Sequence, residues 1–488
     1  MSLAKKAVRG AAWTIGTSMG ARLVGVVGTL VITRFLAPEI IGEVAVASVL
    51  VLTANQLSIF GFGHYLIAKP TSGRPAAFHA SFYHLTFGVV ALAVVLLARD
   101  ELTPIFGSPH AVIYVPGLVL AVFLDRLSYM PERVLVRDMR FSTVGLGRTV
   151  AEFSYTGVSV GLAAYGWGGE AIVAANIVRA ALRLLIFGTR ASWREWIEPH
   201  RLTRAQTRDL FRFGLPISIA TTANFASRKW DNLLFSSIFG PGPMGTYNLA
   251  YNLADIPASQ VGEHIGDVLL PSFAHMEERP RKRALVRSTA LLALIVFPLA
   301  VGLGAVSETL VAALFNQEWQ GVAPLLLVLS ALAVFRPIGW TIASYLQVRD
   351  MTRQIMYLEV FKVAALLSGL AGLGYLWGPA WACAGVGAGF ALHAIASCWM
   401  VQLADDIKMT RMLAGFVGPL LACAPMVAAV YGVRHALHAA GVHNVYLFLA
   451  LEIAAGALAY VPAAFLFARP TALDCIALIR KSFGRATR

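Results

Sequence analysis

The chain has little charge and little cysteine for its length. Only 14% of its 488 residues are charged, whereas an ordinary soluble domain is roughly 25% charged. The four cysteines fall in predicted helices or near the C-terminus, so no disulfide framework is expected. Apolar residues make up 58% of the chain, and this balance predicts a protein whose solvent is the lipid bilayer.

Sequence signatures of several enzyme classes are also missing. No GxxxxGK[ST] phosphate loop occurs, so ATP is not expected to drive the protein directly. No HExxH motif occurs, and His435, His438 and His443 have only weak metal-like spacing, so neither a metal nor a cofactor is predicted. The net charge is +14, but no basic soluble domain exists to carry a nucleic-acid site. We therefore expect neither an enzyme nor a nucleic-acid partner.

Long apolar segments predict about fourteen membrane-spanning helices. Each runs for about 20 residues or more, which is too long for the alternating strands of a membrane barrel. The predicted fold class is therefore an all-α polytopic membrane protein. The spans lie near residues 11–33, 41–67, 77–98, 111–130, 142–165, 170–189, 213–236, 244–270, 286–306, 322–346, 354–376, 379–400, 412–433 and 445–468.

The placement of the basic residues predicts the orientation of these spans. With the N-terminus inside, every second loop gathers arginine and lysine, and the opposite loops hold only Arg34, Arg99 and Arg434. Cytoplasmic loops of membrane proteins carry such an excess of positive charge. Both termini are therefore expected in the cytoplasm.

Two halves of the chain repeat each other. Pro38 and Gly42 recur as Pro241 and Gly245, and the letters Val-Arg-Asp-Met at 136–139 recur at 348–351. We expect the prolines and glycines to form tight turns. Because each copy holds six spans, the copies are expected to be parallel, as in many transporters. The predicted lobes are residues 1–200 and 201–405, followed by helices 13 and 14 and a basic tail in 406–488.

Basic residues within the predicted spans favour an anionic substrate. A charge at the bilayer centre costs at least about 2.5 kcal/mol, so such residues normally face a partner or a watery cavity. A guanidinium group can also donate two parallel hydrogen bonds to two oxygens of one phosphate. The predicted cavity residues are Arg22, Arg228, Lys229, Arg336 and Lys362.

Three other arginines in the spans have simpler expected roles. Arg126 is expected to form a local ion pair with its neighbour Asp125, and Arg179 and Arg183 are expected to extend toward lipid headgroups.

Carboxylates in the spans are the candidates for coupling transport to an ion gradient. The predicted residues are Asp231, Asp255 and Glu359. Asp231 follows Arg228 by three residues and so shares its helix face, where a proton or sodium ion on Asp231 would compete with the substrate bound by Arg228. The alternative is that Asp231 only neutralises the nearby cations Arg228 and Lys229. Asp255 precedes Pro257, where a broken helix is expected to expose carbonyl groups.

The repeated loops place one Arg-Asp pair in each half on the predicted cytoplasmic side. Arg137 with Asp138 and Arg349 with Asp350 are candidates for an inner gate that exchanges partners between the halves. The alternative is that they only fix the topology and cap helices.

The order of these motifs resembles a known family. Ala12-Trp13, Arg34 through Pro38 with Gly42, Phe211 through Pro216, and Gly240-Pro241 with Gly245 are similar to the Wzx-type polysaccharide transporter flippases of the multidrug, oligosaccharidyl-lipid and polysaccharide exporter superfamily. The family usually has Leu-Gly-Pro in the outer loop, whereas the first copy here has Leu36-Ala37-Pro38.

The resemblance implies a V-shaped pair of six-helix lobes around a cavity in the bacterial inner membrane. It implies alternating access for an undecaprenyl-pyrophosphate-linked oligosaccharide in exopolysaccharide, capsule or O-antigen synthesis. Polymerases and glycosyltransferases of the same pathway are implied partners, and the two extra helices would hold the polyprenyl tail. The alternatives are a cation-coupled multidrug extruder of the same superfamily and an integral-membrane polysaccharide polymerase or glycosyltransferase.

Overall fold

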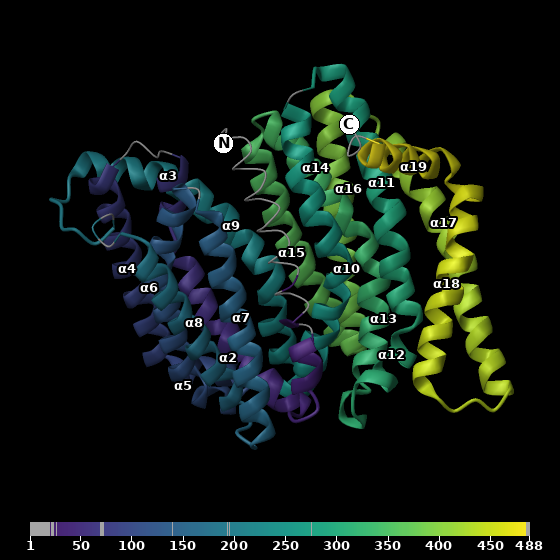
Figure 1. The fold of residues 1–488 in the computed structure, drawn as a ribbon, viewed down its shortest axis with the longest axis horizontal. Coiled ribbons are helices and arrows are strands. Elements are labelled where there is room, and N and C mark those ends of the chain that lie inside the picture. The colour runs from purple at the N-terminus through teal and green to yellow at the C-terminus, as the bar shows by residue number, and fades with distance from the viewer. Residues whose placement is uncertain are drawn as a thin grey trace. The chain divides into compact units, whose positions relative to one another are not determined.

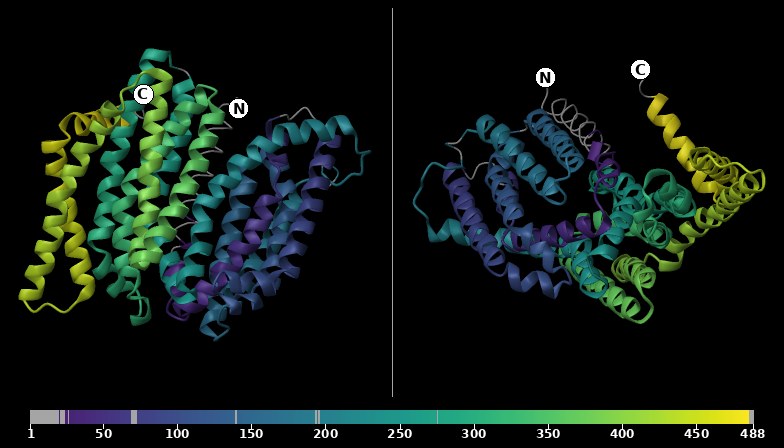
Figure 2. Two further views of the ribbon diagram at one scale, coloured as in Figure 1. Left: turned by 180° about the vertical axis from the view of Figure 1, so that it is seen from behind. Right: turned by 90° about the horizontal axis from the view of Figure 1, so that it is seen from below.

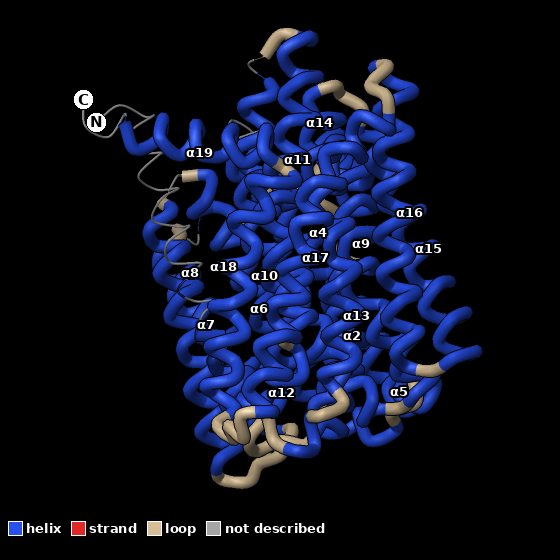
Figure 3. Tube along the Cα trace, turned by 90° about the vertical axis from the view of Figure 1, so that its right-hand side faces the viewer, coloured by secondary structure: helices blue, strands red, loops and turns tan. Residues whose placement is uncertain are grey.

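The computed structural model describes residues 20, 24–25, 27–68, 73–138, 140–192, 194, 196–274 and 276–484. These residues form helices joined by short loops, and no strand occurs among them (Figure 3). The predicted all-α class is therefore confirmed.

The chain divides into two compact units, Met1–Gly245 and Thr246–Arg488. The helices of the first unit are α2 (Pro38–Leu57), α3 (Phe62–Ala68), α4 (Gly73–Leu97), α5 (Arg99–Ile105), α6 (Val115–Arg137), α7 (Phe141–Ala164), α8 (Glu170–Arg190) and α9 (Arg204–Phe239), with a 3₁₀ turn, η2 (Pro109–Ile113). Helix α10 (Pro241–Ala274) begins at the end of this unit and continues into the second.

The second unit holds the remaining helices. They are α11 (Glu278–Ala305), α12 (Ser307–Leu314), α13 (Val322–Leu332), α14 (Arg336–Val348), α15 (Thr352–Trp377), α16 (Pro379–Asp405), α17 (Met409–Ala439), α18 (Val445–Phe467) and α19 (Arg469–Gly484), with the 3₁₀ turns η4 (Gln317–Trp319) and η5 (Ala333–Phe335). The unit boundaries reflect packing, whereas the predicted lobes reflect the repeat, so the lobe boundaries at 200 and 405 stay predictions.

Helices occur at every predicted span after the first, whose residues lie largely outside the described part of the chain. Nine helical segments of the described residues are long and apolar enough to cross a membrane. They are α2, α4, α8, α11, α13 with α14, α15, α16, α17 and α18. The helices α6, α7, α9 and α10 fall outside that set, so the number fourteen stays a prediction.

Helix α9 belongs to the first unit because its backbone approaches two glycine-containing loops closely. A Cβ atom on Gly214 would lie 1.8 Å from the carbonyl oxygen of Phe60, in the link between α2 and α3. Near the other end of α9, the hydroxyl groups of Ser236 and Ser108 share a hydrogen bond of 3.1 Å. The neighbouring Gly107 has a φ of 68°, which favours glycine. Both contacts need small residues, since any larger side chain would push α9 away.

The repeated proline and glycine residues pack against each other in the first unit. A Cβ atom on Gly42 would lie 1.9 Å from the carbonyl oxygen of Pro241, and one on Gly245 would lie 1.9 Å from that of Pro38. Pro38 and Pro241 are each the first residue of a helix, a position that needs no N–H donor. The expected tight turns are therefore wrong: the prolines begin α2 and α10, and the glycines let the first turns of these helices touch.

The second unit ends in a helix pair and a crossing helix. Helices α17 and α18 lie side by side, and α19 runs across their end and packs on α11 and α18 (Figures 1 and 2). At the opposite end of the pair, Arg434 of α17 donates to the buried Glu452 at 2.7 Å and to Glu308 at 2.8 Å. Arg434, which the charge pattern assigns to an outer loop, thus ties the pair to α12.

Candidate functional site

The predicted cavity residues of the first unit differ in exposure. Arg22 lies outside the described residues, so its pairing with Arg228 stays a prediction. On α9, Arg228 is exposed and Lys229 is half-buried, whereas Asp231 is fully buried and its Oδ1 accepts a hydrogen bond from the N–H of Asn232 at 2.9 Å. Arg228 and Asp231 therefore lie in different surroundings, one exposed and one buried, although they are only three residues apart on α9.

In the second unit, the predicted cation Arg336 pairs with the predicted coupling carboxylate Asp255. The Nη1 of Arg336 binds the Oδ1 of Asp255, and the two side chains are 6% and 29% exposed. The guanidinium carbon lies 5.0 Å from the ring centre of Tyr251 and 4.5 Å from that of Phe390, distances at which cation–π attraction acts. The Nε of Arg336 is buried and has no hydrogen-bond partner among the described residues.

Helix α10 carries Asp255 without a break. It runs continuously from Pro241 to Ala274, through Pro257. The expected broken helix is therefore wrong, and Asp255 lies on a continuous helix with Arg336 as its ion-pair partner.

The second predicted cation, Lys362, also pairs with a predicted coupling carboxylate. Its Nζ binds the Oε2 of Glu359 one turn earlier on α15, and the Nε2 of His393 on α16 lies 3.9 Å from the Oε1 of Glu359. Lys362 and His393 are buried. His393 and Phe390 are one turn apart on α16. The trio, through His393, and the Arg336–Asp255 pair, through the contact of Arg336 with Phe390, therefore both meet helix α16.

The sequence predicted these residues but not their pairing. It assigned Arg336 and Lys362 to substrate and assigned Asp255 and Glu359 to an ion, whereas the structure joins each cation to one carboxylate. His393 was missed, because a single histidine in an apolar helix gives no signal until its neighbours are known. Among the described residues, no group of three or more His, Cys, Asp or Glu residues is placed to hold a metal ion.

Arg126 does not pair with Asp125, so the expected local ion pair is wrong. Arg126 is 3% exposed and donates to the backbone carbonyls of His84 and Ser58, at 2.7 and 3.0 Å, and to the side chains of Ser58 and Asn55. Adjacent residues of a helix point in different directions, which explains why the two side chains do not meet.

Asp125 is instead bound by Arg183, at 2.6 Å. Arg183 also binds Glu132 at 2.7 Å, and Arg179 lies 3.6 Å from Glu152. The expected extension of Arg179 and Arg183 to lipid headgroups is therefore wrong. These pairs join α6, α7 and α8 within the first unit, where they neutralise charge inside apolar helices.

The two repeated Arg-Asp loops have different local structures. In the first copy, Arg137 binds the adjacent Asp138 at 3.0 Å. In the second copy, Arg349 binds Asp405 at 2.9 Å, and Asp350 takes a left-handed backbone with a φ of 57°. Arg349 therefore has its partner outside its own loop, and Asp350 occupies the turn that ends α14. A gate role for the four residues stays a prediction.

Comparison with known proteins identifies the family. A family described as Polysaccharide biosynthesis protein matches residues 31–324. The chain belongs to this family. It is 25% identical over 370 residues to the Lipopolysaccharide biosynthesis protein WzxC of Escherichia coli (strain K12), covering 74% of each chain. It is 24% identical over 327 residues to the Succinoglycan biosynthesis transport protein ExoT of Rhizobium meliloti (strain 1021), covering 66% of this chain and 65% of ExoT.

A solved structure shows the same fold. The lipid II flippase MurJ in an inward closed conformation superimposes with a TM-score of 0.74 at 13% identity, covering 94% of this chain and 99% of MurJ. This family member is therefore an all-α polytopic membrane protein, and the predicted resemblance to polysaccharide transporters is confirmed.

Proposed function

We propose that the protein is a flippase that moves undecaprenyl-pyrophosphate-linked oligosaccharides across the bacterial inner membrane by alternating access. The family match over residues 31–324 carries this proposal, together with relatives whose names specify polysaccharide biosynthesis and transport. The product would enter exopolysaccharide, capsule or O-antigen synthesis. The protein would act with polymerases and glycosyltransferases of that pathway, as a transporter and not as an enzyme.

Arg22, Arg228 and Lys229 would bind the pyrophosphate and sugar. Arg228 is exposed on α9, which supports access to a ligand. Guanidinium and ammonium groups are the usual partners of phosphate oxygens. The gate candidates Arg137, Asp138, Arg349 and Asp350 would act on the cytoplasmic side, where both termini would also lie.

The ion pairs of the second unit support a coupling step. Removing one member of a buried pair leaves a buried charge and costs about 3 to 5 kcal/mol, so Arg336 does not leave Asp255 unless something replaces the lost attraction. A proton or sodium ion on Asp255 would release Arg336 to the substrate anion. The Glu359–Lys362–His393 trio would respond in the same way.

A transport assay tests the function. The full-length protein is reconstituted into vesicles that contain a fluorescent polyprenyl-pyrophosphate oligosaccharide, and the fraction of label open to an added reductant is followed. We expect the protein to equilibrate the lipid between leaflets without ATP. A deletion strain is expected to accumulate lipid-linked repeat units on the inner face of the membrane.

Other outcomes would favour the alternatives. Accumulation of unpolymerised units on the outer face would point to a polymerase. Drug resistance on overexpression, with no change in polysaccharide, would point to a multidrug extruder.

A double variant tests the roles of Arg336 and Asp255. Arg336→Gln with Asp255→Asn removes both charges and keeps hydrogen-bonding groups of similar size. If the pair is only structural, the double variant transports like wild type, whereas each single variant is impaired. We expect the double variant to fold but to lose dependence on the ion gradient, and retained dependence would remove the pair from coupling.

A further inference from the structure

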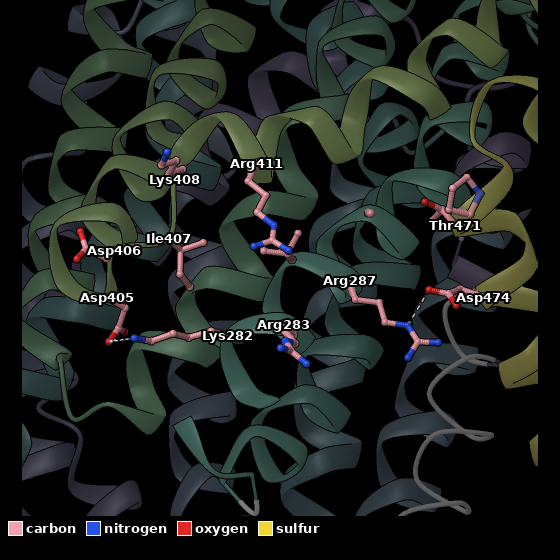
Figure 4. Close-up of a pocket in the computed structure, with 13 residues that line it drawn as sticks. Lys282, Arg283, Arg287, Asp405, Asp406, Ile407, Lys408, Arg411, Thr471 and Asp474 are labelled. Carbon is pink, nitrogen blue, oxygen red and sulfur yellow. Dashed lines mark ion pairs between the residues drawn. The ribbon is translucent and has the colours of Figure 1, made fainter. Parts of the chain in front are cut away.

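A cavity of about 710 Å³ lies in the second unit, and its lining includes no member of the Arg336–Asp255 pair or the Glu359–Lys362–His393 trio. The beginning of α11, the loop between α16 and α17, the beginning of α17 and the beginning of α19 form its walls. Five basic residues line it, and Figure 4 shows Arg411 extending from α17 toward the middle of the group. The basic residues are Lys282, Arg283, Arg287, Lys408 and Arg411.

Two of the three acidic residues in the lining already have partners. Asp405 accepts from Arg349 at 2.9 Å and from the hydroxyl of Tyr345 at 2.8 Å, and Lys282 lies 3.7 Å away. Asp474 binds Arg287 at 2.9 Å. These pairs use Lys282 and Arg287, so they leave the other three basic residues to be balanced.

Arg283, Lys408 and Arg411 form no ion pair within the described part of the chain. Asp406 is the remaining carboxylate of the lining, and it is exposed. The cavity therefore has a surplus of positive charge at side chains that can move toward a ligand. A multiply charged anion would match this surplus.

The position of the cavity along α17 matches the level expected for lipid headgroups. Val417 follows Arg411 by six residues on α17 and is 54% exposed, as is expected of a side chain that faces lipid tails. Six residues of helix rise about 9 Å. The headgroup layer of one leaflet is about 5 to 8 Å thick. An arginine at this distance from the apolar surface therefore reaches the phosphates of that layer.

Helix α19 supports the same placement. It runs across the end of the α17–α18 pair (Figure 1), with Ala472 buried in the core while Leu473 and Ile476 are 51% and 38% exposed. A helix with an apolar face and basic residues that lies across spanning helices is typical of the membrane interface. One wall of the cavity is thus an interfacial helix, beside which the chains of a bound lipid can enter the bilayer.

We propose that this cavity binds the phosphate or pyrophosphate headgroup of a membrane lipid, through Arg283, Lys408 and Arg411. The thirteen lining residues in the described part of the chain include no aromatic side chain, so they offer no aromatic surface on which a nucleotide base would stack. Two lipids share the required chemistry: an anionic phospholipid of the bilayer and a polyprenyl pyrophosphate. The site does not depend on which lipid the protein transports.

Lipid binding to the detergent-purified, delipidated full chain tests the proposal. Native mass spectrometry measures the affinity for four probes, namely phosphatidylglycerol, phosphatidylcholine, polyprenyl pyrophosphate and inorganic pyrophosphate. The cavity variant is Arg283→Gln with Arg411→Gln. The matched control is Arg204→Gln with Arg208→Gln, which removes the same charge from two exposed arginines of α9.

We expect the cavity variant to bind its preferred anionic lipid at least about tenfold more weakly than wild type, because two charge-assisted hydrogen bonds are lost. The control is expected to bind like wild type. The lipid whose affinity falls more in the cavity variant is the one that the cavity prefers. A larger fall for phosphatidylglycerol identifies a bilayer lipid, and a larger fall for polyprenyl pyrophosphate identifies a polyprenyl carrier. Equal falls for these two lipids mean that the cavity accepts any anionic lipid phosphate.

Three results would overturn the proposal. Unchanged affinity in the cavity variant would exclude the cavity, and equal loss in both double variants would mean that binding reflects net charge. Inorganic pyrophosphate binding as tightly as the lipids would make this a site for a soluble anion. Both substitutions replace exposed side chains, so gel filtration is expected to show a folded protein in each case.

Discussion

A single arginine shows how this protein keeps a charge inside an apolar helix without a carboxylate. Among the described residues, Arg126 forms no ion pair, and its donors meet backbone carbonyls and neutral side chains. Ser58 is the C-terminal cap of α2. The end of a helix carries a partial negative charge, and a cation there is stabilised by about 0.3 to 2 kcal/mol. Arg126 thus caps α2 from α6.

Gly88 makes room for this arginine, and we predict that Gly88→Ala destabilises the protein. A Cβ atom there would lie 1.6 Å from the Nε of Arg126, so the guanidinium would have to leave its carbonyl partners. We expect a loss of about 2 to 4 kcal/mol, from overpacking and unsatisfied buried groups. Thermal unfolding in detergent measures it. The control is Gly157→Ala, where a Cβ atom meets nothing within 4 Å; equal midpoints for the two variants would contradict the role of Gly88.

Asp350 allows the gate hypothesis to be separated from a capping role. It lies just past α14 with a φ of 57°, and the N–H of Met351 donates to the carbonyl of Leu346 at 3.0 Å, as in a Schellman motif. Glycine adopts this backbone without strain, so Asp350→Gly removes the carboxylate and keeps the turn. We predict unchanged stability, because the turn is kept, and reduced transport in the vesicle assay, because the proposed gate loses one carboxylate. A folded variant with unchanged transport would assign Asp350 to the turn alone.

At the scale of elements, the contact between α2 and α10 depends on two glycines. We predict that Gly42→Ala and Gly245→Ala each lower stability by about 1 to 3 kcal/mol, because backbone oxygens stand where the new methyl groups would be. Both changes separate the same two helix turns, so the double variant should cost less than the sum of the single variants. Thermal unfolding midpoints of the three variants measure this.

The control for this contact lies three residues before Gly245. Gly242→Ala changes the same turn of α10, but a Cβ atom there meets nothing within 4 Å. We expect wild-type stability. A control as unstable as Gly245→Ala would mean that the turn needs glycine for its backbone and not for the contact.

The elements themselves were largely predictable, since apolar length and turn signals locate helices well. The exceptions have physical causes. Helix α19 was predicted only as a basic tail, because its apolar residues are too few for a span and become meaningful once they pack beside α11 and α18. The single predicted span at 41–67 is divided into α2 and α3 around Gly61, whose φ of 63° interrupts the helix.

At the scale of the whole molecule, the sequence was enough to locate charged residues within the predicted spans, but it did not reveal which residues they pair with. Arg336 and Asp255 are 81 residues apart, and Arg434 and Glu308 are 126 apart. Only packing brings such residues together. Partners such as the carbonyls that bind Arg126 belong to every residue type and leave no sequence signal.

The distribution of charge over the whole chain makes a final prediction, the position of its loops relative to the membrane. His443 lies between α17 and α18 and is exposed, and Arg204 is exposed at the start of α9. Seven long helical segments of the described chain separate them: α9, α10, α11, α13 with α14, α15, α16 and α17. If all seven cross the membrane, their odd number puts the two sites on opposite sides, with Arg204 on the arginine-rich cytoplasmic side.

Cysteine labelling in intact cells measures this arrangement. The substitutions His443→Cys and Arg204→Cys are made separately in a Cys475→Ala background, because Cys383, Cys398 and Cys423 are buried. We expect a membrane-impermeant maleimide to label His443→Cys in intact cells and to label Arg204→Cys only after the membrane is opened. Labelling of both sites in intact cells would mean that an even number of segments crosses between them, and the reverse pattern would place the basic loops outside, against the charge rule.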